Sequence, residues 1–180
     1  MHSLLAAALA LAAPNPLTAD ICATLVPETL RQQLERRFHD VRLPVEADSP
    51  LADRKYAAAH GNTCLLVASA DFNGDGKPDL VLLLPRKVAA GYRLVVAVDS
   101  PGGYAVTSLE SSPAPVTNLY VDAAKPGTYS HTEAYEFQPA PGVAERIVSA
   151  QAGFRFGALE AASDVYFLKQ DRWIRVHAED

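Results

Sequence analysis

Residues 71–79 read DFNGDGKPD, and this stretch decides how the surrounding chain is interpreted. It contains three aspartates, one asparagine and two glycines within nine residues. An apolar run at 64–70 precedes it, and a second apolar run, Leu80 to Leu84, follows it. Short apolar runs bounded by turn-forming residues are typical of β-strands. The sequence therefore predicts a polar loop that joins two strands.

The run from Leu80 to Leu84 consists only of leucine and valine, with no polar residue in alternation. A strand that faces water on one side alternates between apolar and polar residues, whereas a strand buried on both faces does not. We therefore expect this strand to be central and the N-terminal helices to cover one of its faces. The polar loop is then attached to the middle of the fold.

The spacing of oxygen-bearing residues in the loop predicts a calcium site. Calcium takes roughly six to eight oxygen ligands, and a tightly curled loop aims alternate residues at one point. Gly74 and Gly76 permit the backbone angles of such a curl. Magnesium is disfavoured because it resists losing its water, and the alternative is an acidic hairpin without a metal. The predicted ligands stand at positions 1, 3, 5, 7 and 9 of the loop: Asp71, Asn73, Asp75, Lys77 through its main-chain carbonyl, and Asp79.

Residues 70–80, ADFNGDGKPDL, resemble the calcium loops of FG-GAP and VCBS-type repeats. The resemblance implies a calcium ion held by the five alternate positions, between two antiparallel strands. The loop is not an EF-hand, because position 12 is Leu82 and not glutamate. The chain contains one copy, so we do not expect a propeller of many FG-GAP repeats. It is also similar to small exported bacterial proteins that hold a single such loop.

The first residues predict export. Leu4 to Ala13 is an unbroken run of leucine and alanine, which suits a signal peptide and is too short to span a bilayer. We expect residues 1–19 to form a signal peptide and residues 20–180 to form a single domain. The alternative is an N-terminal core helix. The predicted location is periplasmic or secreted, without a membrane span in the mature form.

The chain has two cysteines, Cys22 and Cys64, and no CxxC motif. In an oxidising compartment, an even number of cysteines favours disulfide pairing. We therefore predict a disulfide between Cys22 and Cys64, with two free thiols as the alternative. Such a bridge would tie the mature N-terminus to the strand that leads into the polar loop.

The fold class follows from the order of apolar patterns. A helix is predicted after Pro27, where Leu30, Leu34, Phe38 and Val41 form one apolar stripe, and a short helix is predicted at 50–60. From Cys64 onward, short apolar runs with tight turns predict an antiparallel sheet. The segment 125–141 is irregular and is a candidate for a long mobile loop. We expect an α+β fold with N-terminal helices packed on an antiparallel β-sheet that carries one calcium-binding hairpin loop.

Composition and motifs limit the function. The net charge is −5 and the basic residues are scattered, so a nucleic-acid partner is not expected. The sequence contains no recognised catalytic motif, and no catalytic or organic-cofactor residue is predicted. We expect an exported calcium-binding domain, a binding or interaction protein with a structural calcium ion and an unidentified protein or glycan partner. The alternatives are an inhibitor or immunity-like protein of a secreted enzyme, and a cell-envelope hydrolase.

Overall fold

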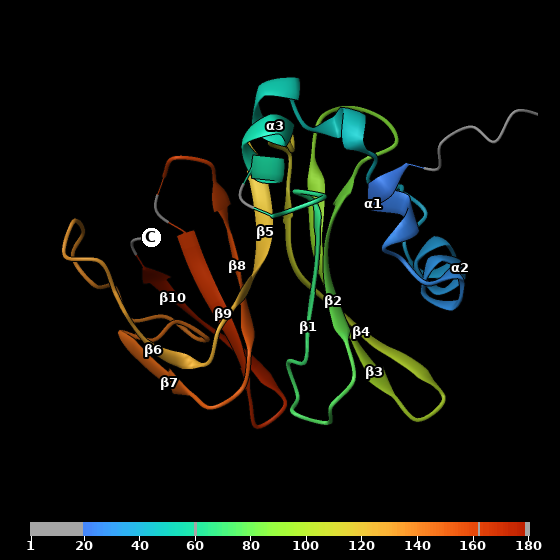
Figure 1. Cartoon of the computed structure of the whole chain (residues 1–180). Helices are drawn as coiled ribbons and strands as arrows, with labels where there is room; N and C mark the ends of the chain where they lie inside the picture. Colours follow the sequence, from blue (N-terminus) through green and yellow to red (C-terminus); the bar gives the residue numbers. More distant parts are fainter. Residues whose placement is uncertain (1–19, 60, 162, 179–180) are drawn as a thin grey trace, which may run out of the picture.

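The computed structural model describes residues 20–178 except 60 and 162 (Figure 1). The predicted signal peptide at 1–19 lies outside the described residues. The described part consists of helices and antiparallel sheets, so the α+β prediction is confirmed. Among the described residues, no helix has the length and apolar character needed to cross a membrane.

The helices lie in the N-terminal third of the chain. Helix α2 (Glu28–Arg37) begins after Pro27, as predicted, and buries Leu30 and Leu34. Phe38 and Val41 follow the helix and are also buried, so the predicted apolar stripe is confirmed. The predicted second helix is α3 (Leu51–Ala59), preceded by the short helix η1 (Glu46–Asp48).

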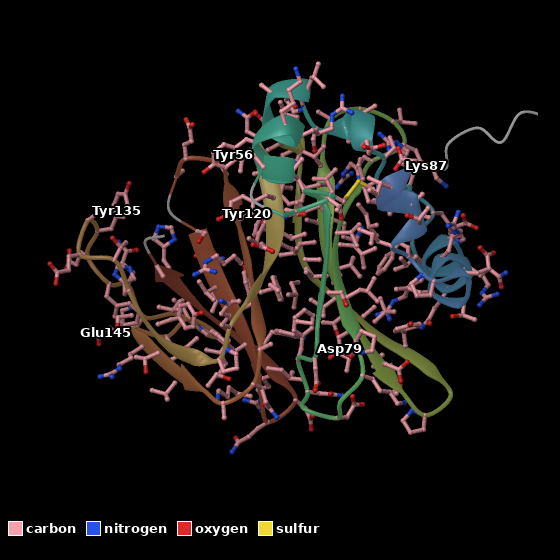
Figure 2. All side chains as sticks on the ribbon, viewed as in Figure 1. Tyr56, Asp79, Lys87, Tyr120, Tyr135 and Glu145 are labelled. Carbon is pink, nitrogen blue, oxygen red and sulfur yellow. A yellow bond between two sulfur atoms is a disulfide. The ribbon has the colours of Figure 1, made fainter. Side chains whose placement is uncertain are left out.

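Helix α1 (Ile21–Thr24) carries the first cysteine of a disulfide. The bond joins Cys22 to Cys64, whose Cα atoms are 5.3 Å apart, and uses both cysteines of the chain (Figure 2). The predicted pairing is therefore confirmed. Helix α1 was not predicted, because four residues are too few to show a helical period. The Asp20 side chain caps it by accepting hydrogen bonds from the backbone N–H groups of Cys22 and Ala23, at 3.0 and 3.3 Å.

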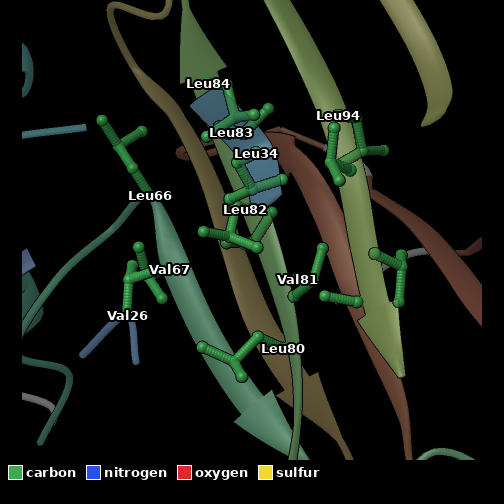
Figure 3. Packing of buried hydrophobic residues seen from close by; sticks show 14 of the residues in the cluster. Val26, Leu34, Leu66, Val67, Leu80, Val81, Leu82, Leu83, Leu84 and Leu94 are labelled. Atoms are coloured by element: carbon green, nitrogen blue, oxygen red, sulfur yellow. The ribbon is translucent and has the colours of Figure 1, made fainter. Parts of the chain in front are cut away.

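The first sheet contains the polar loop. Its four antiparallel strands follow chain order: β1 (Val67–Ala70), β2 (Asp79–Pro85), β3 (Tyr92–Ser100) and β4 (Gly103–Ser112). Every residue of β2 is buried, including the run from Leu80 to Leu84, so the predicted central strand is confirmed. Figure 3 shows these side chains packed with Leu34 of α2 and with residues of β1 and β3.

A second four-stranded sheet, which the sequence did not separate from the first, has the order β10-β9-β8-β5. Its strands are β5 (Leu119–Ala124), β8 (Gly153–Ala158), β9 (Ser163–Lys169) and β10 (Arg172–Ala178). Strands β6 (Gly127–Ser130) and β7 (Arg146–Ser149) form a separate ribbon. The expectation of one antiparallel sheet is thus corrected to two sheets and a ribbon. The irregular assignment of 125–141 is wrong for β6, whose sequence GTYS lacks a strand-like apolar pattern.

The two sheets face each other across one core. They meet at β1 and β5, and the Val121 N–H of β5 donates to the carbonyl of Leu65, two residues before β1, at 2.8 Å. One hydrophobic cluster joins α2, the first sheet and the inner residues of the second sheet, including Val121 and Phe154. Helices α1 and α2 lie on the opposite side of the first sheet (Figure 1). The loop between β1 and β2 therefore lies at one end of this core.

The outer strand of each sheet is covered by other parts of the chain. Along β4, the Gln33 side chain of α2 donates to the Tyr104 carbonyl, and Arg37 donates to the Val106 carbonyl. Along β10, the segment 131–144 forms backbone hydrogen bonds with Arg175 and His177, in the C-terminal half of the strand. The segment expected to be mobile is thus bonded to the second sheet near both of its ends.

Candidate metal site

The polar loop connects two paired strands. Ala70 of β1 lies opposite Asp79 of β2, so residues 71–78 form the turn between them. Gly74 and Gly76 have φ angles of +80° and +84°, which glycine adopts without a steric cost. The two glycines allow the chain to curl twice within a few residues, as the sequence predicted.

Asp71 organises the first half of the loop. Its Oδ1 accepts hydrogen bonds from the backbone N–H groups of Gly74 at 2.6 Å and Asp75 at 3.1 Å. Its Oδ2 accepts from the N–H of Gly76 at 2.9 Å. Because three successive backbone N–H groups of the loop bond to the Asp71 carboxylate, the negative charge of Asp71 lies inside the curl.

Asn73 and Asp75 also turn their side-chain oxygens toward the loop backbone. Asn73 Oδ1 accepts from the Asp75 N–H at 3.0 Å, and Asp75 Oδ1 accepts from the Lys77 N–H at 2.9 Å. The Lys77 N–H and the Asn73 side-chain amide lower the pKa of Asp75, because both stabilise its charged form. The structure therefore brings Asp71, Asn73 and Asp75 together, with Asp75 held as a carboxylate.

Asp79 lies at the start of β2, on the core side of the loop, and is fully buried (Figure 2). Its Oδ2 accepts from the Phe72 N–H at 2.8 Å, and its Oδ1 accepts from the Asp99 N–H at 2.8 Å. Burial raises the pKa of Asp79 and the nearby charge of Asp75 adds to this, although the backbone amides of Asp99, Phe72 and Asn73 act in the opposite direction. Among the described residues, no lysine or arginine forms an ion pair with Asp79.

The Lys77 side chain forms an ion pair with Asp99 on β3. Its Nζ lies 2.8 Å from Asp99 Oδ1 on β3, and the side chain is half exposed. The ammonium group therefore acts mainly on Asp99, and its charge interaction with Asp75 is weaker. Only its main-chain carbonyl remains as the predicted ligand at this position.

Contacts that the sequence did not indicate attach the loop to the second sheet. Phe72 is fully buried, with its ring centroid 5.7 Å from that of Phe154 and 5.6 Å from that of Trp173. Gln151, in the turn before β8, donates from Nε2 to the Asn73 carbonyl at 2.9 Å. These partners lie about 80 to 100 residues away in the chain, where no local pattern marks them. The loop is consequently fixed between the two sheets.

The donor set suits calcium chemistry. A buried carboxylate without a positive partner is costly, and a divalent cation in the loop would offset that cost. Over the described part of the chain, no group of three or more histidine, cysteine, aspartate or glutamate side chains is arranged to hold a metal ion. Asp71, Asp75 and Asp79 are therefore not gathered into such a group in this structure, and the predicted set adds the Asn73 amide oxygen and the Lys77 carbonyl to them. Oxygen ligands of mixed charge in a curled loop are the kind that calcium accepts.

One family resemblance is found by comparison with known proteins. The FG-GAP repeat matches residues 66–82, which include β1, the loop and the first part of β2. No curated protein and no solved structure matches the chain. The repeat covers a small part of the 180 residues, and it suggests a binding or interaction domain.

Proposed function

We propose that this protein is an exported binding or interaction domain stabilised by one calcium ion in a VCBS-like single FG-GAP loop. The observation that carries the proposal is Asp79, a fully buried carboxylate beneath two further aspartates with no described cationic partner. When bound, calcium supplies a positive charge that these carboxylates share. The residues that would hold it are Asp71, Asn73, Asp75, Lys77 through its carbonyl, and Asp79.

The ion's role in this proposal is structural. Asp71, Asp75 and Asp79 repel one another, and the repulsion acts on a loop whose Phe72 is inserted between the sheets. Neutralising the three charges keeps the loop curled and therefore keeps Phe72 in place. Calcium thus stabilises the contact between the two sheets, and partner binding takes place elsewhere on the surface.

Calcium removal should lower the melting temperature of the wild-type protein. A ligand present at about 100 times its dissociation constant stabilises a fold by about 2.7 kcal/mol. For a domain of this size, that corresponds to a rise of roughly 5–10 °C. We expect this difference between calcium and EDTA in thermal melts, and we expect Asp75→Ala to abolish it. The control is Glu35→Ala, which removes an exposed carboxylate from α2 and should keep the difference.

Fluorescence gives a second measure of the same event. Trp173 is the single tryptophan of the chain and its ring contacts Phe72. Calcium titration should therefore change its emission in the wild-type and Glu35→Ala proteins and leave Asp75→Ala unchanged. The proposal would be contradicted if calcium changed neither the melting temperature nor the Trp173 emission of the wild-type protein.

Export is supported by the disulfide. Such bonds persist in oxidising compartments and are rare in the cytosol. We place the protein in the periplasm or outside the cell, with residues 1–19 as the signal peptide and residues 20–180 as one domain.

Inhibition of a secreted enzyme is a second candidate function, favoured by the segment 131–144. Thr132 and Ala144 donate backbone hydrogen bonds to β10, at 2.9 and 2.8 Å, so the segment is held near both ends. Between them Tyr135 projects from the body and is 65% exposed (Figure 2).

A panel of secreted proteases and cell-wall hydrolases tests this second candidate. We expect the wild-type protein to inhibit one enzyme and Tyr135→Ala to inhibit it about 30-fold less well, the loss typical of an aromatic anchor. Glu35→Ala is the surface control. Inhibition that is absent, or that Tyr135→Ala leaves intact, would exclude this segment as an inhibitory loop.

A further inference from the structure

Strands β1 and β5 are the edge strands at which the two sheets meet (Figure 1). The opposite edges are covered, β4 by side chains of α2 and β10 by the segment 131–144. At the meeting edges, one backbone hydrogen bond joins Val121 of β5 to Leu65, which precedes β1. Within β1 itself, no hydrogen bond to β5 is formed among the described residues. The edge of β1 is therefore the one that the described chain leaves uncovered.

The backbone groups of β1 point alternately toward β2 and toward the uncovered edge. The Leu83 N–H of β2 donates to the Leu66 carbonyl at 2.9 Å, so the backbone of Leu66 points toward β2. Because opposite residues in an antiparallel pair alternate between bonded and non-bonded, Val67 and Ser69 point their backbone groups away from β2. No described residue forms a hydrogen bond with these groups. Such a row of unpaired N–H and carbonyl groups is a template for a further strand.

A pocket of about 260 Å³ lies along this edge. Its lining includes Val67 and Ser69 of β1, Asp122 of β5, and the apolar side chains of Leu25 and Leu80. The pocket and the unpaired backbone groups thus belong to the same residues of β1. Val67 is only 3% exposed, and a buried backbone group without a partner costs free energy that an added strand would recover.

The side chains beside the pocket favour a basic ligand group. An adjoining pocket of about 230 Å³ shares Asn62 and Asp122 with the first. It is also lined by Tyr56, Tyr120 and Glu160, and Figure 2 labels the two tyrosines. Asp122 and Glu160 are exposed, and the described lining of the two pockets contains no lysine or arginine. Carboxylates and tyrosine rings both attract a lysine or arginine side chain.

We propose that the β1 edge binds an extended peptide segment of a partner protein, which adds as a strand and places a lysine or arginine beside Asp122. The segment pairs through its backbone with Val67 and Ser69, and an apolar side chain contacts Leu25 and Leu80. In strand addition, main-chain hydrogen bonds give affinity and alternate side chains give specificity. The inference rests on the proposed role as an interaction domain and names the class of partner.

Synthetic peptides test this proposal on the mature protein kept in calcium. The probes are short, fluorescently labelled peptides of alternating valine and threonine, in which one threonine is replaced by lysine at each position in turn. We expect lysine peptides of this set to bind, as measured by fluorescence anisotropy. The same peptides with methylated backbone nitrogens should not bind, because methylation removes the N–H groups that pair with β1 and keeps the side chains.

Two variants separate backbone pairing from charge. Ser69→Pro removes the N–H that points to the edge and leaves the hydrogen bonds to β2 in place, a position where strands accept proline. It should bind the lysine peptide about 10-fold more weakly than Ser69→Ala, which lacks the same hydroxyl but keeps the N–H. Asp122→Asn keeps an acceptor for the Ala123 N–H and should abolish the preference for lysine over threonine peptides. Glu35→Gln, which neutralises an exposed carboxylate on α2, is the matched control and should keep that preference.

Thermal melting checks that each variant is folded, and the methylated peptides decide the question if Ser69→Pro is not. The proposal is overturned if no peptide binds, if methylated peptides bind as tightly as unmethylated ones, or if Ser69→Pro and Ser69→Ala bind equally. A wild-type dimer in light scattering that Ser69→Pro abolishes would assign the edge to a second copy of this chain and would also overturn it. None of these results affects the calcium proposal, which is tested by the difference between calcium and EDTA.

Discussion

Phe72→Ala should lower the free energy of unfolding by about 3–5 kcal/mol, the usual cost of removing a buried phenylalanine side chain. Phe72 is fully buried and its ring contacts Phe154 and Trp173 of the second sheet. Alanine would leave a cavity where the loop meets that sheet. The loss reflects the contact between the sheets as well as the stability of the loop itself.

Urea unfolding in saturating calcium, followed by circular dichroism, measures this loss. Tyr135→Ala provides the control, since its exposed aromatic ring contributes little to folding and should change stability by less than about 0.5 kcal/mol. A Phe72→Ala protein within 1 kcal/mol of the wild type would mean that the ring does not hold the sheets together.

Removing the disulfide should cost about 2–4 kcal/mol, because the bond closes a 42-residue separation and restricts the unfolded chain. The double variant Cys22→Ser, Cys64→Ser avoids a lone reactive thiol. Both cysteines are buried, where the bond attaches α1 to the residues that enter β1.

The double variant is compared with wild-type protein whose disulfide has been reduced. Reductant should destabilise the wild-type protein to the level of the double variant, while the double variant should not respond to it. A thiol assay on denatured, unreduced protein from its native export route should detect no thiols. Two free thiols in that assay would show that the bond does not form.

The elements that were predicted correctly are those whose structure depends on residues adjacent in the chain. The run from Leu80 to Leu84 predicted a strand buried on both faces, because a short aliphatic run beside a glycine-rich polar loop favours a buried strand. Pro27 predicted the start of α2, since proline fits the first turn of a helix. Gly61, with a φ of +82°, lies just beyond the end of α3 at Ala59, close to the predicted end of the short helix.

The pairing of strands that are distant in the chain could not be predicted from the sequence, in contrast to the hairpin of β1 and β2. Strands β5 and β8 pair across the insertion that contains β6 and β7. The apolar pattern of a strand states which face is buried but not which strand lies beside it. One sheet and two facing sheets therefore have the same local signature.

Some residues of the candidate site could likewise be predicted from local sequence, and others could not. The alternate oxygen residues of the loop could be identified from spacing, and the structure gathers Asp71, Asn73 and Asp75 into one curl. Gln151 could not be identified, because its bond to the Asn73 carbonyl depends on how the second sheet packs. His131 and His177 are likewise far apart in the sequence, and their rings come close because the segment 131–144 packs along β10.

Helix α2 covers the edge of β4, and this cover affects the tendency of the protein to self-associate at high concentration. An exposed strand edge is a template for pairing with another chain, and here Gln33 and Arg37 occupy the carbonyls that such a chain would need. Helix α2 begins four residues after α1, which the disulfide holds against the first sheet. Reduction of the disulfide would therefore loosen the N-terminal helices and expose the edge of β4 to pairing with another chain. The bond that stabilises the fold thus also protects it from self-association.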